Sequence, residues 1–200
     1  LASLKGLRVL RLWNTRVSGT GLAALERMAD LQELSLWNCS VTDAGLRHLV
    51  ECGNLRYLNL NGTMVTGLGL TALAPLQELR HLWLRGLDVA DRHLHHLPHL
   101  PELELLDLRE TGVTDKGLAR LGEIDKLASL SLQETRITDD GLAHLADMSA
   151  LWFLNLSDTA VTCSGLAHLA KLKDLRVLWL NRTGITDAGV RHLAAMTGLK

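Results

Sequence analysis

The sequence repeats with a period of 24 residues along almost its whole length. Apolar residues occupy positions 1, 4, 6, 11, 16, 19 and 22 of each repeat, and position 11 is always Val or Ile. A fixed period of this length is typical of a solenoid, in which each repeat packs only against its neighbours. No insertion separates the eight repeats, which start at Leu7, Leu31, Leu55, Leu79, Leu103, Leu127, Leu151 and Leu175.

The spacing within a repeat predicts one strand followed by a short helix. Positions 4 and 6 alternate as in a strand with one buried face, and positions 16 and 19 have the spacing of a helix. Thr at position 12 stands where a helix N-cap belongs, and Gly at position 15 allows neighbouring coils to approach closely. One repeat cannot bury its own leucines, so we expect the strands to stack about 4.8 Å apart in a parallel sheet.

The chain resembles leucine-rich repeat proteins over its full length. Repeat two is most similar to the cysteine-containing subtype found in substrate receptors of F-box ubiquitin ligases and in many bacterial proteins. The resemblance implies an α/β fold, a curved right-handed solenoid of eight repeats with a parallel sheet on the concave face and short helices on the convex face. The residues that carry the resemblance are Leu36, Cys39, Val41, Thr42, Asp43, Gly45, Leu46 and Cys52.

We expect residues 1–200 to form a single solenoid domain. Leu1 and Leu4 match positions 19 and 22 of a preceding repeat, and Leu199 begins a ninth. Solenoids normally need polar caps at both ends. The sequence therefore predicts a piece of a longer array, or an array whose ends are covered by something else.

Composition argues against several classes of function. The formal net charge is -1, so there is no electrostatic footprint for nucleic acid or an anionic membrane surface. No run of 18 or more apolar residues exists, which argues against membrane insertion. The three Cys residues fit neither a disulfide framework nor a zinc site. We therefore expect a cytoplasmic protein, with secretion left open.

Every aromatic residue falls at repeat position 2, 3, 5 or 7. In leucine-rich repeat proteins these positions flank the buried Leu pair and project toward the concave face. Every Lys or Arg at these positions is Arg, and Trp, Tyr and Arg are enriched in the centres of protein interfaces. The predicted partner-binding residues are Arg11, Trp13, Trp37, Tyr57, His81, Trp83, Arg85, Asp107, Arg109, Trp152, Phe153 and Trp179.

Repeat four breaks the pattern at several positions together. Leu87 and Ala90 replace Thr, and His93 replaces the Gly of position 15. His93 and His96 lie three residues apart and are weak metal-ligand candidates, but no carboxylate or Cys completes a ligand set with a familiar spacing. We therefore expect a local kink or an altered contact surface, and neither a metal site nor a cofactor.

Catalytic motifs are missing from the sequence. It contains no nucleophile elbow, phosphate loop or paired carboxylates, so we do not expect an enzyme. The predicted function is a non-catalytic module that binds a protein or peptide on its concave face. Two alternatives remain open: an architectural or substrate-receptor segment that contacts other domains of the same chain, or carbohydrate binding by exposed Trp residues with the help of Asn59, Asn61, Asn155 and Asn181.

Overall fold

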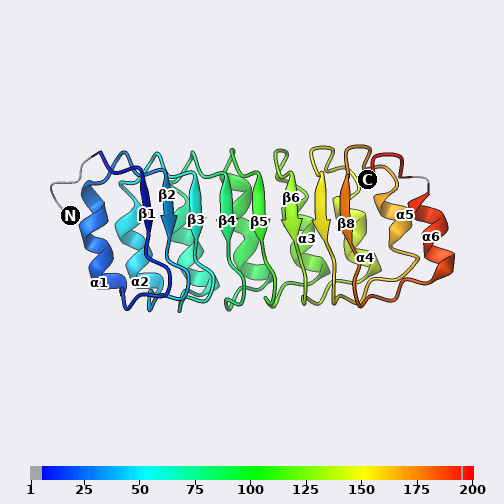
Figure 1. Cartoon of the computed structure of the whole chain (residues 1–200), viewed down its shortest axis with the longest axis horizontal. Coiled ribbons are helices and arrows are strands. Elements are labelled where there is room, and N and C mark those ends of the chain that lie inside the picture. The colour runs from blue at the N-terminus through cyan, green and yellow to red at the C-terminus, as the bar shows by residue number, and fades with distance from the viewer. Residues whose placement is uncertain (1–5, 195) are drawn as a thin grey trace.

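The strands of the eight repeats form one parallel sheet (Figure 1). The structure, a computed structural model, describes residues 6–194 and 196–200. Within these residues each repeat contributes one strand, and the eight strands pair in chain order. They are β1 (Val9–Arg11), β2 (Glu33–Ser35), β3 (Tyr57–Asn59), β4 (His81–Trp83), β5 (Leu105–Asp107), β6 (Ser129–Ser131), β7 (Phe153–Asn155) and β8 (Val177–Trp179).

Short helices cover one face of the sheet and leave the other, the concave face, open (Figure 1). This arrangement confirms the predicted leucine-rich repeat solenoid. The predicted partial repeat at Leu1 and Leu4 lies outside the described residues. None of the described helices has the length and apolar character needed to cross a bilayer. The helices are α1 (Gly19–Leu22), η1 (Ala23–Arg27), α2 (Asp43–Leu46), η2 (Arg47–Leu49), η3 (Gly67–Leu73), η4 (Asp91–His99), α3 (Asp115–Leu121), α4 (Asp139–Leu142), η5 (Ala143–Leu145), α5 (Leu166–Leu169) and α6 (Asp187–Leu193).

The register of the sheet follows the sequence period. Neighbouring strands pair residues 24 positions apart, so Leu58 lies beside Leu82. Leu82 and Leu84, at positions 4 and 6, are fully buried, whereas position 3 and 5 side chains of the same strand project to the concave face. Burying one Leu contributes about 1.5–3 kcal/mol. A shift of one residue would turn every core Leu outward, so the leucines hold the register in place.

Each strand ends in a sharp turn at position 8, which the sequence did not reveal. This position has a positive φ in all eight repeats, between 53° and 72°. Gly adopts this left-handed conformation freely, whereas other residues meet a steric cost of about 1–2 kcal/mol. The turn places the position 7 and 8 side chains at the C-terminal ends of the strands, where Arg85 pairs with Glu110 and Arg182 with Asp158. The residues at position 8 are Asn14, Asn38, Gly62, Gly86, Glu110, Glu134, Asp158 and Arg182.

Thr at position 9, present in six of the eight repeats, ties the turn to the end of its own strand. The Thr111 hydroxyl, for example, donates a hydrogen bond of 2.7 Å to the carbonyl of Leu108. Cys39 takes this place in repeat two, and its thiol donates to the carbonyl of Leu12 in the preceding repeat at 2.9 Å. The Thr residues that replace the first cysteine of the subtype therefore satisfy a strand carbonyl.

Asp at position 13 joins neighbouring repeats on the helical side. Asp91 Oδ1 accepts a hydrogen bond from Thr114 N at 2.7 Å, and Asp91 Oδ2 accepts one from Thr114 Oγ1 at 2.6 Å. Thr114 does lie at the N-cap of α3, as expected, and it also accepts a bond from Lys116 N. The link between repeats was not predicted. We call it the Asp–Thr ladder, and its other acidic members are Asp43, Asp115 and Asp139.

Candidate functional site

The predicted binding residues stand in rows on the concave face. Positions 3 and 5 are in register across the sheet, so Tyr57 lies beside His81, and Trp83 lies beside Asp107. Large exposed aromatic residues are uncommon on a folded protein unless they contact something. The most exposed ones are 44% to 53% accessible, and they are Trp13, Trp37, Trp152 and Trp179.

Five residues from the first four repeats form the N-terminal aromatic cluster. The rings of Trp13 and Trp37 stack with their centroids 6.3 Å apart. His81 makes edge contacts with Tyr57 at 4.5 Å and with Trp83 at 5.8 Å. Burial lowers the pKa of His81, so its imidazole is neutral at pH 7. The cluster therefore presents an uncharged aromatic surface.

The C-terminal aromatic cluster consists of Trp152, Phe153 and Trp179. Phe153 packs edge-on against both Trp rings, with centroid distances of 5.8 Å and 5.2 Å. Phe153 is only partly exposed, because the two Trp rings shield it. These contacts orient the Trp rings in advance, which lowers the entropy lost when a partner binds.

A groove connects the two aromatic clusters. It has a volume of about 310 Å³ and lies over β5 and β6. It exists because Ser129 stands in register between Leu105 and Phe153, so that a small side chain separates two large ones. Leu105, Ser129 and Ser131 were not among the binding residues predicted from the sequence. Their outward positions 3 and 5 were the available signal. This β5–β6 groove is lined by Trp83, Leu105, Leu106, Asp107, Arg109, Ser129, Ser131, Trp152, Phe153, Asn155 and Trp179.

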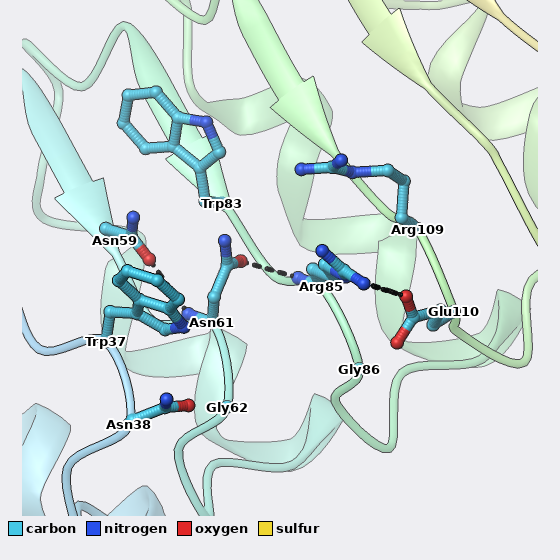
Figure 2. Close-up of a pocket in the computed structure, with 10 residues that line it drawn as sticks. All are labelled: Trp37, Asn38, Asn59, Asn61, Gly62, Trp83, Arg85, Gly86, Arg109 and Glu110. Atoms are coloured by element: carbon cyan, nitrogen blue, oxygen red, sulfur yellow. Dashed lines mark hydrogen bonds and ion pairs between the residues drawn. The ribbon is translucent and has the colours of Figure 1, made fainter. Parts of the chain in front are cut away.

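A second hollow, of about 530 Å³, lies at the ends of strands β3 and β4 (Figure 2). Asn59 and Asn61 lie between the rings of Trp37 and Trp83 in this view, with two Arg residues on the opposite side. Asn59 Oδ1 accepts a bond from Asn61 N at 3.0 Å, which fixes the orientation of its amide. We call this hollow the Asn cavity; its lining residues are Trp37, Asn38, Asn59, Asn61, Gly62, Trp83, Arg85, Gly86, Arg109 and Glu110.

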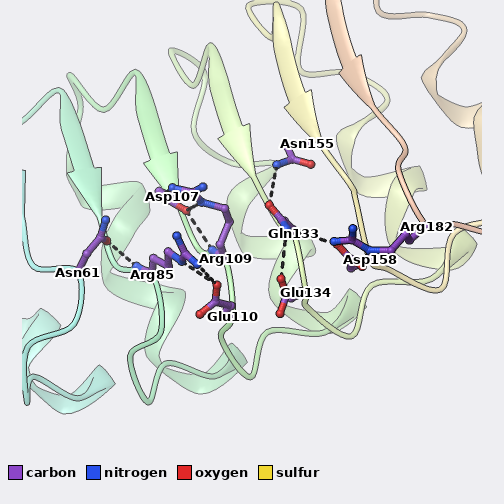
Figure 3. A network of polar contacts seen from close by, with 10 residues as sticks. All are labelled: Asn61, Arg85, Asp107, Arg109, Glu110, Gln133, Glu134, Asn155, Asp158 and Arg182. Carbon is purple, nitrogen blue, oxygen red and sulfur yellow. Dashed lines mark hydrogen bonds and ion pairs between the residues drawn. The ribbon is translucent and has the colours of Figure 1, made fainter.

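The predicted Arg contacts already have acidic partners (Figure 3). Arg85 Nε donates to Glu110 Oε1 at 2.7 Å, across one repeat. Arg109 binds Asp107 through two bonds of 2.9 Å and 2.7 Å. Arg11 likewise pairs with Glu33 on the neighbouring strand at 2.6 Å.

One of the predicted contact residues, Asp107, is covered by a neighbouring side chain. Asp107 is only 3% exposed, because Arg109 covers its carboxylate. The same hydrogen bonds raise the pKa of Arg109. Asp107 therefore positions Arg109, and its carboxylate is already paired within the chain; its role as a direct contact stays a prediction. Sequence alone could not show this, because the pairing depends on how the two side chains fold over the strand end.

His93, one of the two weak metal-ligand candidates, has a packing role. It is only 5% exposed, and its Nδ1 accepts a hydrogen bond from Ala90 N at 3.0 Å. In the Asp–Thr ladder, the equivalent backbone N–H donates to an Asp of the preceding repeat. Here the preceding repeat has Gly67 in place of that Asp. The His93 ring fills the empty space, because a Cβ built on Gly67 would lie 1.9 Å from His93 Nδ1.

His96, the second candidate, is half-buried and packs against His95, with ring centroids 3.7 Å apart. Across the described residues, no group of three His, Cys, Asp or Glu side chains could hold a metal ion. The irregularities of repeats three and four therefore compensate for one another through the pair Gly67 and His93.

Burial of His93 predicts a loss of stability in acid. Burial is the main cause that lowers the pKa of His93 below its usual 6.5, and Arg92 lowers it further. The unfolded chain therefore gains a proton near pH 6.5 that the folded chain resists. We expect the urea midpoint to be constant above this pH and to fall as the pH decreases below it. Because the pKa values of His81 and His96 are also lowered, the control is a variant in which Gly67→Asp, Ala90→Thr and His93→Gly restore the ladder. An equally steep acid loss in that variant would show that His93 contributes nothing.

Comparison with known proteins supports the architecture. A family model described as "Leucine Rich repeat" matches residues 51–74, and no curated protein matches the sequence. The structure is similar to internalin C2 from Listeria monocytogenes, at 27% identity and a TM-score of 0.82, over 99% of this chain and 80% of that one. An internalin of the same organism, inlF, has 22% identity and a TM-score of 0.81, and this chain covers 54% of it. The plant peptide hormone receptor RGFR1, solved in complex with RGF2, has 16% identity and a TM-score of 0.62, with 36% of it covered.

Proposed function

Because the chain is a leucine-rich repeat protein, we propose that it is a non-catalytic module that binds a protein or peptide on its concave face. The exposure of Trp13, Trp37, Trp152 and Trp179 carries this proposal, since an exposed Trp that only filled space on a sheet would cost solubility. Trp and Arg are also the side chains that contribute most to binding in protein interfaces. RGFR1, which has the same fold, is described as a peptide hormone receptor in complex with RGF2, and this supports the general class.

The charges of the face support a protein partner over a polyanion. Arg11, Arg85 and Arg109 each hold a carboxylate of this chain. A polyanion gains affinity mainly because unpaired Lys and Arg side chains neutralise its charges and release the cations condensed on it. Paired Arg residues offer little of that gain, whereas they still present flat guanidinium surfaces and free N–H groups to a protein.

The proposal is tested with a displayed library of random peptides of about 12 residues, longer than the roughly nine that an extended chain needs to cross strands β2 to β8. We expect wild-type protein to select peptides. The triple variant Trp37→Ala, Trp83→Ala and Arg85→Ala should bind them at least about 30-fold more weakly, as expected for the loss of about 2 kcal/mol or more at an interface centre.

The matched control is Met64→Ala with Leu68→Ala. These side chains are 64% and 69% exposed but lie outside the concave rows, so peptide affinity should be unchanged. Equal affinity of the triple variant and the wild type would refute binding on the concave face. Equal losses in both variants would show that exposed apolar surface binds peptides without specificity.

A second candidate function, carbohydrate binding, is favoured by the Asn cavity. Its Trp37 and Trp83 rings offer flat faces for a sugar, and Asn59 and Asn61 lie between them. A glycan array separates the two functions: glycan binding that the triple variant loses, without peptide selection, would replace our proposal. Absence of both activities would leave the architectural alternative, in which the segment contacts other domains of its own chain.

A further inference from the structure

Three neighbouring hollows of the concave face share lining residues, and together we call them the trough. The Asn cavity and the β5–β6 groove share Trp83 and Arg109. A smaller hollow of about 270 Å³, lined by Arg11, Glu33 and Tyr57 among others, shares Trp83 and Asn59 with the Asn cavity. Trp83 therefore lines all three hollows. The trough crosses the strands, so it fits an elongated ligand better than a compact one.

The Asn cavity offers hydrogen-bond donors, whereas the side-chain oxygens of Asn59 and Asn61 already accept hydrogen bonds from the backbone. Asn61 Oδ1 accepts from Arg85 N at 2.7 Å, and Asn59 Oδ1 accepts from Asn61 N. The strand carbonyls of Asn59 and Trp83 accept backbone bonds of 2.9 Å and 3.0 Å from the preceding repeats. By contrast, the amide nitrogens of Asn59 and Asn61 and the indole N–H groups bind no other lining residue (Figure 2). These donors favour a ligand that supplies acceptors.

The charges around the cavity argue that these acceptors are neutral. The carboxylates of Glu110 and Asp107 already neutralise Arg85 and Arg109. A carboxylate ligand would compete with these internal pairs and gain little, because the guanidinium charges are compensated.

The β5–β6 groove has a different chemistry, suited to an apolar side chain. Its walls are the aromatic rings of Trp83 and Phe153, and Leu105 forms part of its lining. Ser131 Oγ is buried and has no hydrogen-bond partner among the described residues. A buried hydroxyl without a partner, close to aromatic walls, fits an apolar side chain next to a peptide amide.

We infer that the trough binds an extended, uncharged peptide segment. Neutral acceptors of the segment, carbonyls or Asn and Gln side chains, lie over the Asn cavity, and an aliphatic or aromatic side chain fills the β5–β6 groove. The inference rests on the proposed function and specifies its ligand. Asn59 and Ser131 are three strands apart, about 14 Å, so about four residues of an extended peptide separate the two groups.

The test uses the peptides selected above, synthesised with acetylated and amidated ends, and the variant Asn59→Asp. This substitution keeps the oxygen that accepts from Asn61 N and replaces the free amide donor by a charged acceptor. We expect affinity to fall about tenfold or more, which corresponds to about 1.4 kcal/mol. The control Asn54→Asp adds the same charge outside the trough, where Asn54 donates to the carbonyl of Ala29, and should leave affinity unchanged.

A second variant, Ser129→Leu, fills the β5–β6 groove without changing the donors of the Asn cavity. We expect this variant to bind peptides that carry an apolar residue more weakly than the wild type does. Its affinity for peptides in which Gly replaces that residue should be unchanged. Two outcomes would overturn this inference and leave the proposed function intact. One is that Asn59→Asp binds normally the peptides that the triple variant no longer binds. The other is a peptide consensus rich in Asp and Glu. Failure of the wild type to select any peptide would overturn both.

Discussion

Adding one methyl group at Gly67 should destabilise the protein by about 3 kcal/mol. The new Cβ would lie 1.9 Å from His93 Nδ1 and 2.1 Å from its Cγ, far inside contact distance. The ring cannot move without losing its bond to Ala90 N, because the repeat packs closely around it. Overpacking of a well-packed site typically costs about 1–3 kcal/mol, and here a buried N–H also loses its acceptor. Urea unfolding of Gly67→Ala against wild type measures the effect.

Two further variants test whether the contact with His93 causes this loss of stability. In Gly67→Ala with His93→Gly the clash is gone, so we expect part of the lost stability to return. Gly53→Ala is the matched control, since a Cβ at Gly53 has no neighbour within 4 Å. If Gly67→Ala were no less stable than Gly53→Ala, the conclusion that the His93 ring fills the space beside Gly67 would be wrong.

Asp115→Ala should lower the free energy of unfolding by about 2–3 kcal/mol, because it removes one pair of hydrogen bonds of the Asp–Thr ladder. Asp115 accepts bonds of 2.8 Å and 2.7 Å from the N and Oγ1 of Thr138. Hydrogen bonds to a charged group each contribute about 1.5–3 kcal/mol, and both donors would be left between packed repeats. Thermal and urea unfolding should both show the loss.

The matched control for Asp115 is Asp187→Ala. Both residues are the first acid of a seven-residue helix, α3 and α6, so both interact with the positive end of a helix. Among the described residues, Asp187 has no Thr of a following repeat to bind. We expect Asp187→Ala to lower the free energy of unfolding by only a few tenths of a kcal/mol. Equal losses at the two positions would mean that the helix charge, and not the ladder, makes position 13 acidic.

Repeat seven offers a natural variation of the ladder. Cys163 replaces Asp at position 13, and Thr186 N lies 3.4 Å from its sulfur. The hydroxyl of Thr186, followed by its backbone N–H, lowers the pKa of the Cys163 thiol. Sulfur accepts hydrogen bonds weakly, so this rung contributes less than the Asp rungs.

Much of the fold could be predicted because the repeat signal is local. Leu at positions 4 and 6 and Val or Ile at position 11 report a buried face in every repeat, whatever the neighbouring repeat contains. The turn at position 8 escaped prediction because Glu110 and Arg182 are poor residues for a positive φ. The surrounding structure imposes that conformation, and their side chains then form ion pairs with the neighbouring repeat.

The candidate site could be predicted only in part. Exposure of Trp37 and Trp179 follows from their repeat positions, because those positions face away from the core. The β5–β6 groove does not, since it arises from a small residue, Ser129, between two larger ones on adjacent strands. The sequence places the aromatic residues on one face but does not show which of them share a hollow.

The sequence by itself determined the period, the Leu core and the face on which the aromatic residues lie, because alternation along one strand decides which side chains are buried. Only the tertiary structure decided which side chains are free to bind. Stacking brings residues 24 to 26 positions apart into contact, and these contacts pair Arg85 with Glu110 and fit His93 into the space beside Gly67. The Arg109 side chain turns back over the end of β5 and buries Asp107. Such contacts depend on geometry between coils and at their turns, which no single repeat encodes.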